Sequence, residues 1–441
     1  MITRISALFL VIAFVSIVQT YPYGEASGIQ GMTAFSLGFV IIVGFLMGEI
    51  VVRIQLPRIT GYLIAGMLVG PYMGGWLTKE TVKHLTLIDQ IALSLIAISA
   101  GCELRLSELK HHWKGVVSIT LFQTIGLFAL GTAAFWLLSG WFSFFEDGSQ
   151  IVRLQAGLVF GVIAAAQSPA TTIAIITDLK AKGPATESVL GSAVLKDVLV
   201  IILFTLILSM NHLLDGGELT MEPFVELGGE LFFSIAFGVV AGWGVAFYLK
   251  KVRSDPVLFL LAFSYLVNVG SHSIHLDPVL ICVAAGLVIT NTTNQGERLL
   301  SIIQHGSLVI YVIFFCVAGA ALDLMALRSM VGLAALLVIV RMALLWGCTS
   351  ASMAVARVPN AKASTYWMAF LPQAGVSLGL ASVLEKEGFD WAPPVVTLLI
   401  ACIAINQIVG PILMKYALQQ TGETAETAVA RNRTSPQPAK T

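Results

Sequence analysis

Charged residues are scarce in this chain. Only 11% of its 441 residues are Asp, Glu, Lys or Arg, whereas soluble proteins carry about 25%. Hydrophobic residues make up 57% of the chain, and the mean hydropathy is +0.88. A chain of this composition cannot present a water-soluble surface. It is therefore predicted to be a polytopic membrane protein whose surroundings are the lipid bilayer.

Other scarcities exclude further classes of protein. The formal net charge is zero and basic residues form no runs, so no nucleic-acid partner is expected. The five cysteines stand singly in or beside apolar segments without a CxxC pair, which indicates neither a disulfide frame nor a metal site. We expect no cofactor. An intramembrane hydrolase is poorly supported because there is no HExxH motif and no pair of intramembrane aspartates, so we do not expect an enzyme.

Long apolar runs are what the sequence has in abundance. A membrane-spanning helix needs about 20 apolar residues, and segments of this kind recur along the whole chain. We predict an all-α protein with about thirteen transmembrane helices, at residues 31–52, 59–76, 85–101, 115–142, 154–177, 188–210, 224–249, 255–273, 278–292, 301–322, 331–356, 363–385 and 392–416.

Basic residues are distributed unequally between the loops. Fourteen Lys and Arg residues fall in the loops on one side of the predicted spans and five on the other. Cytoplasmic loops carry the excess of positive charge. The chain is therefore predicted to be a multi-pass inner-membrane protein with a cytoplasmic C-terminus.

The two ends of the chain differ from its middle. In residues 1–28, Arg4 precedes the apolar run 5–18, which we interpret as a signal peptide, with a retained extra N-terminal helix as the alternative. Residues 29–418 form the predicted transmembrane domain. Residues 419–441 are polar and predicted to be a disordered cytoplasmic tail.

Two consecutive apolar segments contain polar interruptions. Residues 154–177 are broken by Gln167-Ser168-Pro169, and residues 188–210 carry Lys196-Asp197 near their middle. An ionisable pair costs several kcal/mol in hydrocarbon, and it indicates a functional site by default. Proline interrupts the helix, and irregular backbone at this depth is tolerated only beside a cavity or inside protein. The sequence therefore predicts an ion-handling site.

A second broken span lies at the same predicted depth. Pro169 is eight residues from the inner end of its span, while Pro372 and Asp197 are each nine residues from theirs. At 1.5 Å per residue these positions are ~12–14 Å deep, near the middle of the membrane. Broken helices at corresponding positions in two halves of opposite direction indicate the binding site of a secondary transporter.

Four further motifs carry a resemblance to a known family. Residues 56–71 (LPRITGYLIAGMLVGP), 98–104 (ISAGCEL), 317–324 (VAGAALDL) and 407–411 (QIVGP) together resemble the monovalent cation:proton antiporter superfamily, of the sodium/proton or potassium/proton exchanger type. The resemblance implies the sodium/proton antiporter fold, with two inverted repeats, crossing discontinuous helices, a homodimer and alternating access. It also implies a role in ion transport and pH homeostasis.

The resemblance assigns roles to individual residues. Asp197 matches the family's ion-carrying aspartate, and Lys196 occupies the preceding position, where the family usually has Asp, Asn or Gln. Gln167 and Ser168 fall in the first unwound crossing and Gln373 in the second. Arg341 lies on a span that often contributes another charged residue.

The chemistry of these side chains leaves several alternatives open. Burial disfavours a charged carboxylate, which lets Asp197 exchange a proton for a cation near neutral pH. Lys196 could form an ion pair with Asp197, but neighbouring residues on a helix do not face each other. We therefore expect Lys196 to reach a freed carbonyl of the crossing, or an acid such as Asp89 or Glu49.

The remaining candidates also have two interpretations each. The hydroxyls of Ser168, Thr171 and Thr172 are hard ligands suited to alkali cations, or they bond to helix carbonyls. Arg341 either takes part in ion binding or clamps helices together. Glu49 is expected to pair with Arg53, four residues further along its helix.

We predict an antiporter that exchanges protons for Na⁺ or K⁺, with Asp197 carrying either ion. The choice between Na⁺ and K⁺ stays open. The alternative is a transport-inactive relative that senses ions or pH or acts as a scaffold, since Lys196 could occupy the place of the cation.

Overall fold

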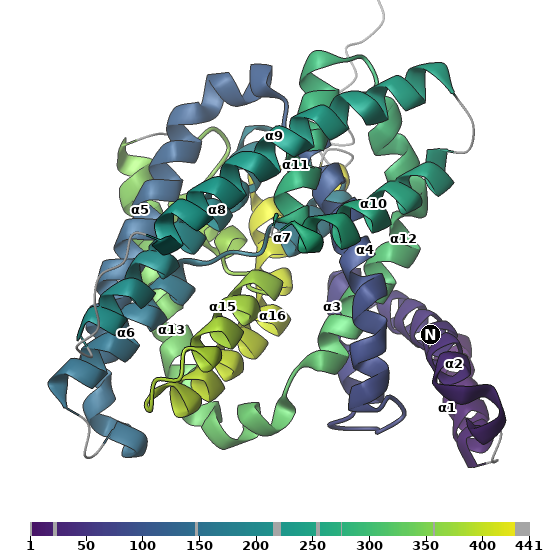
Figure 1. The fold of residues 1–441 in the computed structure, drawn as a ribbon, viewed down its shortest axis with the longest axis horizontal. Coiled ribbons are helices and arrows are strands. Elements are labelled where there is room, and N and C mark those ends of the chain that lie inside the picture. Colours follow the sequence, from purple (N-terminus) through teal and green to yellow (C-terminus); the bar gives the residue numbers. More distant parts are fainter. Residues whose placement is uncertain are drawn as a thin grey trace, which may run out of the picture. The chain divides into compact units, whose positions relative to one another are not determined.

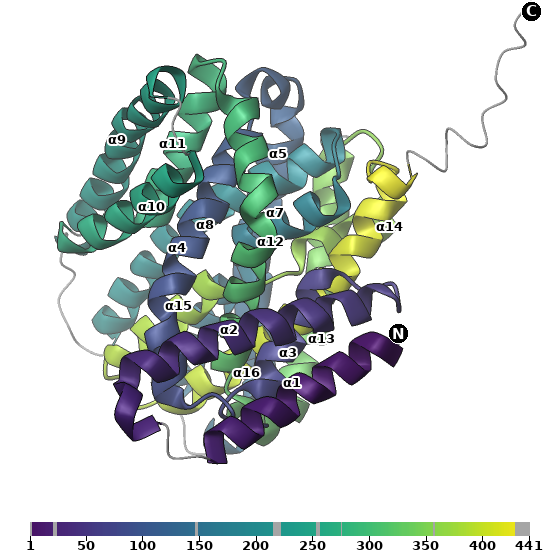
Figure 2. The ribbon, with the colours of Figure 1, turned by 90° about the vertical axis from the view of Figure 1, so that its right-hand side faces the viewer.

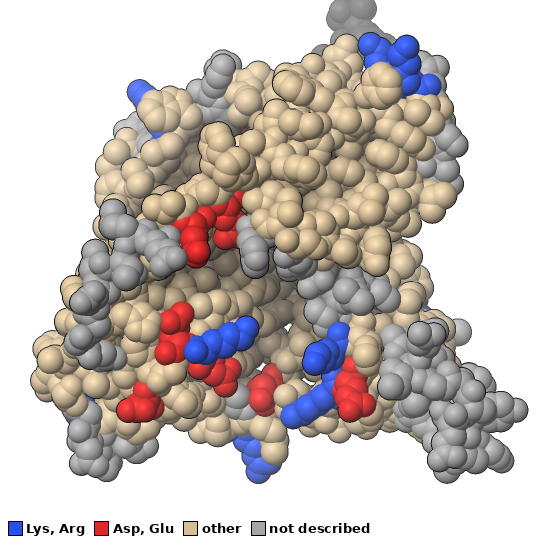
Figure 3. Space-filling model, viewed as in Figure 1, with Lys and Arg blue, Asp and Glu red and all other residues tan. Residues whose placement is uncertain are grey.

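The computed structural model describes residues 2–20, 24–145, 149–214, 222–252, 256–274, 276–355 and 358–427. These described residues are helical throughout apart from turns and short extended links (Figure 1). They fall into two compact units, each built from two separate stretches of the chain. Most of the face in Figure 3 consists of residues other than Lys, Arg, Asp and Glu, as expected for a protein in a bilayer.

Unit 1 covers residues 1–105 and 222–328. Its helices are α1 (Ile2–Thr20), α2 (Gly24–Val52), α3 (Arg58–Val69), α4 (Lys79–Glu103), α9 (Glu222–Lys251), α10 (Pro256–Ser273), α11 (Pro278–Thr292) and α12 (Gly296–Ala321). Helices α1 and α2 lie side by side (Figure 2).

Glycines let two helix pairs of unit 1 approach closely. A Cβ added to Gly66 of α3 would lie 1.9 Å from the carbonyl oxygen of Cys316, and one on Gly319 of α12 would lie 2.3 Å from that of Leu63. Gly101 of α4 and Gly286 of α11 meet in the same way. Small residues allow this backbone approach between membrane helices. The glycines of three of the family motifs are thus places where two helices pack closely together.

Unit 2 covers residues 106–221 and 329–441. Its helices are α5 (Leu106–Leu138), α6 (Gln150–Ala165), α7 (Pro169–Leu179), α8 (Pro184–Leu214), α13 (Leu324–Val355, whose first turn belongs to unit 1), α14 (Ala363–Tyr366), α15 (Gly375–Lys386) and α16 (Ala392–Thr421), with the 3-10 turns η1 (Ser139–Trp141), η2 (Ser143–Phe145) and η3 (Trp367–Phe370). Helix α8 packs against α5, α6, α7 and α15.

The predicted spans correspond to helices. By length and composition, seven described helices can cross a membrane, and two bent helix pairs raise the number to nine. Four shorter apolar helices, at Arg58–Val69, Ile91–Glu103, Pro256–Ser271 and Pro278–Thr292, coincide with the remaining predicted segments. The all-helical fold class is confirmed, and the figure of thirteen spans is compatible with these helices.

Several boundaries and contacts differ from expectation. Helix α16 continues to Thr421 and described residues follow to 427, so residues 419–427 of the predicted tail lie in the described part of the chain. Glu49 pairs with Arg58 at 3.1 Å and with Arg4 at 2.9 Å. Its predicted pairing with Arg53 is wrong because α2 ends at Val52, which takes Arg53 off the helical spacing.

The N-terminal segment is a helix that contacts the rest of unit 1. Besides the ion pair between Arg4 and Glu49, the indole nitrogen of Trp76 donates a hydrogen bond to the Ser16 hydroxyl at 3.0 Å. Both alternatives for residues 1–28, a cleaved signal peptide and a retained helix, stay predictions.

Candidate functional site

The first interruption lies between α6 and α7. Helix α6 ends at Ala165, and Ala166 and Ser168 have extended backbone before Pro169 begins α7. A residue before proline is forced out of the helical region, and proline is well suited to the first position of a helix. The Ser168 hydroxyl caps α7 by accepting a hydrogen bond from the Thr171 amide at 3.2 Å. The sequence therefore produces this break locally.

The second interruption lies between η3 and α15. The chain bends by 55° between Ala363–Phe370 and Gly375–Lys386, with Pro372 and Gln373 in the link. The amide nitrogen of Ser168 donates a hydrogen bond to the carbonyl oxygen of Pro372 at 2.9 Å. The two interruptions therefore touch, which agrees with the equal depth predicted for the two prolines.

Arg341 of α13 holds both interruptions. Its guanidinium donates to the carbonyl oxygens of Ala164 at 2.8 Å, Ala166 at 3.0 Å and Leu371 at 2.9 Å, and the side chain is only 3% exposed. These carbonyls belong to the ends of two half-helices, which carry negative partial charge. Arg341 was given two interpretations, ion binding and a clamp between helices. The geometry supports the clamp.

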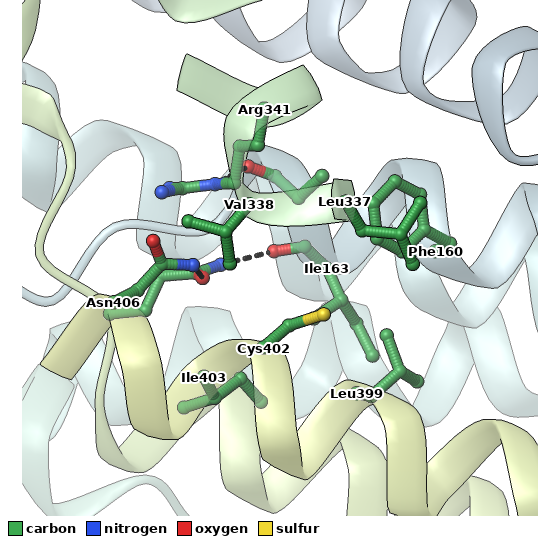
Figure 4. A pocket seen from close by; sticks show the side chains of 11 residues that line it. Phe160, Ile163, Leu337, Val338, Arg341, Leu399, Cys402, Ile403 and Asn406 are labelled. Carbon is green, nitrogen blue, oxygen red and sulfur yellow. Dashed lines mark hydrogen bonds between the residues drawn. The ribbon is translucent and has the colours of Figure 1, made fainter. Parts of the chain in front are cut away.

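Gln373 and Asn406 form a second polar link across the interruptions. The Gln373 amide donates to the carbonyl oxygen of Ile163 at 2.7 Å and accepts from Asn406 of α16 at 2.7 Å. Beside them lies a cavity of about 10 Å³, room for one water molecule (Figure 4). The other Asn406 amide atom, Oδ1, is buried without a hydrogen-bond partner among the described residues.

Lys196 of α8 is completely buried. Its Nζ donates hydrogen bonds to Oε1 of Gln123 on α5 and to Oε1 of Gln167 at 3.2 Å. It also lies 5.0 Å from the ring centre of Phe370. Of the acids predicted as partners of Lys196, Glu49 pairs with arginines instead, and the Asp89 side chain lies outside the described residues.

Threonines complete the hydrogen bonding of both glutamines. Gln123 donates through Nε2 to the Thr349 hydroxyl at 2.8 Å, and Gln167 donates through Nε2 to the Thr172 hydroxyl at 3.4 Å. Thr172 in turn donates to the carbonyl oxygen of Ser168 at 2.8 Å, and Ser168 donates to Thr171 at 2.9 Å. The hydroxyls named as cation ligands therefore also bond to protein atoms, and their role toward a cation stays a prediction.

Asp197 follows Lys196 on α8 and is half-buried rather than fully enclosed. Helix α8 packs against α7, which begins at the first interruption. Asp197 is thus partly exposed, while Lys196 beside it is completely buried.

Two buried polar residues of this region were not predicted. Gln123 lies in the apolar span 115–142, and Asn406 lies in the apolar span 392–416. Both are 0% exposed. A polar side chain in a membrane span is itself a signal of function, and that signal could have identified both.

One further motif has a structural explanation. Residues 375–379 (GVSLG) match the spacing G-x-S-x-G of a hydrolase nucleophile elbow. That elbow requires a strand-to-helix turn, but Ser377 lies in the first turn of α15 after a 3-10 turn. The motif therefore lacks the geometry of a nucleophile.

Two interrupted spans that touch inside the membrane, beside a helix with an ionisable pair, are the architecture of a secondary transporter. The family model described as "Sodium/hydrogen exchanger, transmembrane" matches residues 39–419. The chain belongs to this family.

Known relatives agree with this assignment. The chain is 26% identical to the Na(+)/H(+)-K(+) antiporter GerN of Bacillus cereus, over 60% of this chain and 65% of that protein. It is 24% identical to the Na(+)/H(+) antiporter of Enterococcus hirae, over 62% and 68%. It is 25% identical to the probable Na(+)/H(+) antiporter 3 of Methanocaldococcus jannaschii, over 87% and 97%. The match thus covers about two thirds of the length of each of the first two relatives.

A solved structure has the same fold. The sodium proton antiporter MjNhaP1 of Methanocaldococcus jannaschii matches with a TM-score of 0.64 at 17% identity, over 88% of this chain and all of that one. An electron-microscopy structure of the same antiporter gives 0.71 at 16% identity, over 92% and 99%. The chain therefore has the sodium/proton antiporter fold, with two inverted repeats and discontinuous helices.

Proposed function

We propose that the chain is a secondary antiporter that exchanges Na⁺ or K⁺ for protons by alternating access, with Asp197 carrying either ion. The observation that carries the proposal is the hydrogen bond between Ser168 and Pro372, which joins two broken spans in the unit that also holds Lys196-Asp197. Broken spans of this kind bind ions in secondary transporters. The names of the relatives, Na(+)/H(+) and Na(+)/H(+)-K(+) antiporters, support the same activity.

The half-buried Asp197 is the carrier in this proposal. A carboxylate in partly apolar surroundings binds a proton or a cation to remove its charge. Ser168 and Thr171 supply hydroxyl oxygens near the start of α7, where the partial positive end of a half-helix keeps the cation from binding too tightly. Gln167 and Thr172 contribute indirectly, because their amide and hydroxyl groups are engaged with Lys196.

Lys196 sets the charge of the site in this proposal. If its ammonium persists through the cycle, the site has the same charge with a cation on Asp197 as with a proton there. Exchange of one cation for one proton then moves no net charge. We infer electroneutral exchange.

The cellular setting follows from the loop charges and the family. The chain acts in the inner membrane as a homodimer with its C-terminus in the cytoplasm, where the richer set of Lys and Arg residues lies. Its activity contributes to pH homeostasis.

The test is cation-induced proton release from sealed vesicles that contain the purified protein. Na⁺, K⁺ and Li⁺ are each added over a range of pH, and an internal pH-sensitive dye reports exchange. Asp277→Asn is a matched control in unit 1, because asparagine replaces aspartate well as the cap of α11. We expect release with Na⁺ or K⁺ in the wild type and in this control. A flat response to all three cations would favour the sensor or scaffold alternative.

A further inference from the structure

Tyr366 is completely buried in the half-helix Ala363–Phe370, which precedes the second interruption. Its phenolic hydroxyl donates a hydrogen bond to the carbonyl oxygen of Ala185 at 2.7 Å. Ala185 lies in the first turn of α8, the helix that carries Asp197. The bond therefore joins the second interrupted span to the helix of the proposed ion carrier.

The peptide unit between Ala185 and Thr186 is hydrogen-bonded at both ends. Its carbonyl oxygen accepts from Tyr366, and its N–H group, which belongs to Thr186, donates to the Glu423 carboxylate at 2.8 Å. Hydrogen bonds that follow one another in a chain strengthen each other, and a charged acceptor strengthens them further. Glu423 and Tyr366 therefore act on one peptide unit from opposite sides.

The half-helix contacts α8 at a second level. Phe370, one turn after Tyr366, packs against the tyrosine ring with 5.2 Å between the ring centres, and its own ring centre lies 5.0 Å from Nζ of Lys196. Ala185 and Lys196 are ~16 Å apart along α8 at 1.5 Å per residue. Two contacts at separate levels fix both the position and the direction of the half-helix along α8.

The end of this half-helix forms the second interruption. The carbonyl oxygen of Leu371 accepts from Arg341, and that of Pro372 accepts from the Ser168 amide. A shift of the half-helix along α8 would move both carbonyl groups relative to Asp197. The hydrogen bond of Tyr366 opposes such a shift, because it ties the half-helix to a fixed point near the start of α8.

We propose that Tyr366 is a positioning residue that holds the second interruption at the level of Asp197, and that Glu423 acts on the cation site through it. This inference rests on the proposed role of Asp197 as the ion carrier. It gives the segment that follows α16 an influence on cation affinity.

The test measures the apparent cation affinity of the purified full-length protein in two ways. Proton release from sealed vesicles gives KM and Vmax for Na⁺, K⁺ and Li⁺. The rise of the unfolding temperature in detergent with cation concentration gives an apparent Kd that does not depend on transport. All variants are compared at one pH.

Tyr366→Phe removes only the hydroxyl group. We expect KM and Kd both to rise ~2–10-fold, because one net hydrogen bond no longer favours the arrangement that binds the cation. Vmax should stay close to that of the wild type. A merely structural role would instead reduce the amount of active protein, which lowers Vmax and leaves KM and Kd unchanged, and that result would refute the positioning role.

Glu423→Gln keeps the shape of the side chain and removes its charge. It should raise KM and Kd by a smaller factor than Tyr366→Phe, and it should have no further effect when Tyr366 is already phenylalanine. Residues that act through one contact give non-additive effects of this kind. Equal effects of Glu423→Gln in both backgrounds would refute the connection through Tyr366. If Tyr366→Phe does not fold, an unchanged KM and Kd in Glu423→Gln refutes the proposal.

Two controls separate positioning from general packing. Thr120→Val removes a buried hydroxyl of α5 that lies 3.1 Å from the Ser192 hydroxyl of α8, so it should lower the unfolding temperature without changing KM or Kd. Tyr416→Phe removes an exposed hydroxyl of α16 and should behave as the wild type. A rise of KM in Thr120→Val as large as in Tyr366→Phe would refute a specific role of Tyr366.

The outcomes distinguish this inference from the proposed function. If the wild type releases no protons with any cation, the antiport function is refuted, and the Kd values from thermal unfolding then decide the positioning role. If the wild type exchanges cations but folded Tyr366→Phe has unchanged KM and Kd, the positioning role is refuted alone. A wild type that neither releases protons nor gains stability with any of the three cations refutes both.

Discussion

The amide of Ser168 and the carbonyl of Pro372 share a hydrogen bond of 2.9 Å, although the two residues are 204 positions apart in the chain. Each belongs to a span that is interrupted beside a proline. The bond aligns the ends of the half-helices at one point.

Removing either proline should weaken cation binding. Pro169→Ala or Pro372→Ala allows a more continuous helix and moves the half-helix ends away from their present positions. We expect a higher apparent KM for the cation in both variants, measured by proton release from vesicles. Pro393→Ala at the start of α16 is the control, since Pro393 is at the beginning of an intact helix. An unchanged KM in both variants would argue against a site at the interruptions.

Loss of the Arg341 side chain should destabilise the protein strongly. Arg341→Met leaves three buried carbonyl oxygens without their donor, and each unsatisfied group costs about 1–3 kcal/mol. Thermal unfolding in detergent should show a large decrease in the unfolding temperature. Arg105→Met removes an exposed pair with Glu297, and such pairs contribute only about 0–1 kcal/mol. Equal effects of the two substitutions would contradict the clamp.

Replacing Lys196 should change the properties of exchange without stopping it. Lys196→Gln removes the charge beside Asp197, and the amide can still bond within the cluster of Gln123 and Gln167. We expect continued exchange with a different cation affinity and pH optimum, measured in vesicles. A complete loss of exchange in a folded variant would mean that Lys196 does more than set the charge.

Glu423 should anchor the end of α16 to the start of α8. Its buried carboxylate accepts hydrogen bonds from the Ala185 amide at 3.1 Å, from the Thr186 amide and hydroxyl at 2.8 Å each, and from Asn360 at 3.3 Å. Acidic caps at helix N-termini typically contribute about 0.5–2 kcal/mol.

Glu423→Ala should therefore lower the unfolding temperature more than Glu426→Ala. Glu426 is exposed and bonds only to Gln419 among the described residues, so it is the matched control. Thermal unfolding of both purified variants measures the difference. Equal unfolding temperatures would show that the Glu423 contacts do not stabilise the fold.

Much of this architecture could be predicted from the sequence, because the hydrocarbon core of the bilayer imposes a strict pattern on the sequence of a membrane protein. Apolar runs located the spans, and Gln167-Ser168-Pro169 located the first interruption. Counting residues along the spans placed Pro169 and Pro372 at one depth, which agrees with the bond between Ser168 and Pro372.

The sequence did not reveal which side chains face each other. Depth along a helix is readable from residue number, but rotation about the helix axis and the identity of the neighbouring helix are not. Lys196 was therefore assigned to a carbonyl or an acid, and its bonds to Gln123 and Gln167 were missed. The sequence also did not reveal that Glu423 anchors the end of α16, because a polar segment after the last span has the composition of a disordered tail.

The central claim is that Asp197 carries both the cation and the proton. Asp197→Asn keeps the volume of the side chain but cannot cycle a proton, so it separates transport from folding. Proton release on addition of Na⁺ or K⁺ to vesicles should be present in the wild type and absent in this variant, with the same unfolding temperature within a few degrees. Release at the wild-type rate from Asp197→Asn vesicles would contradict the account.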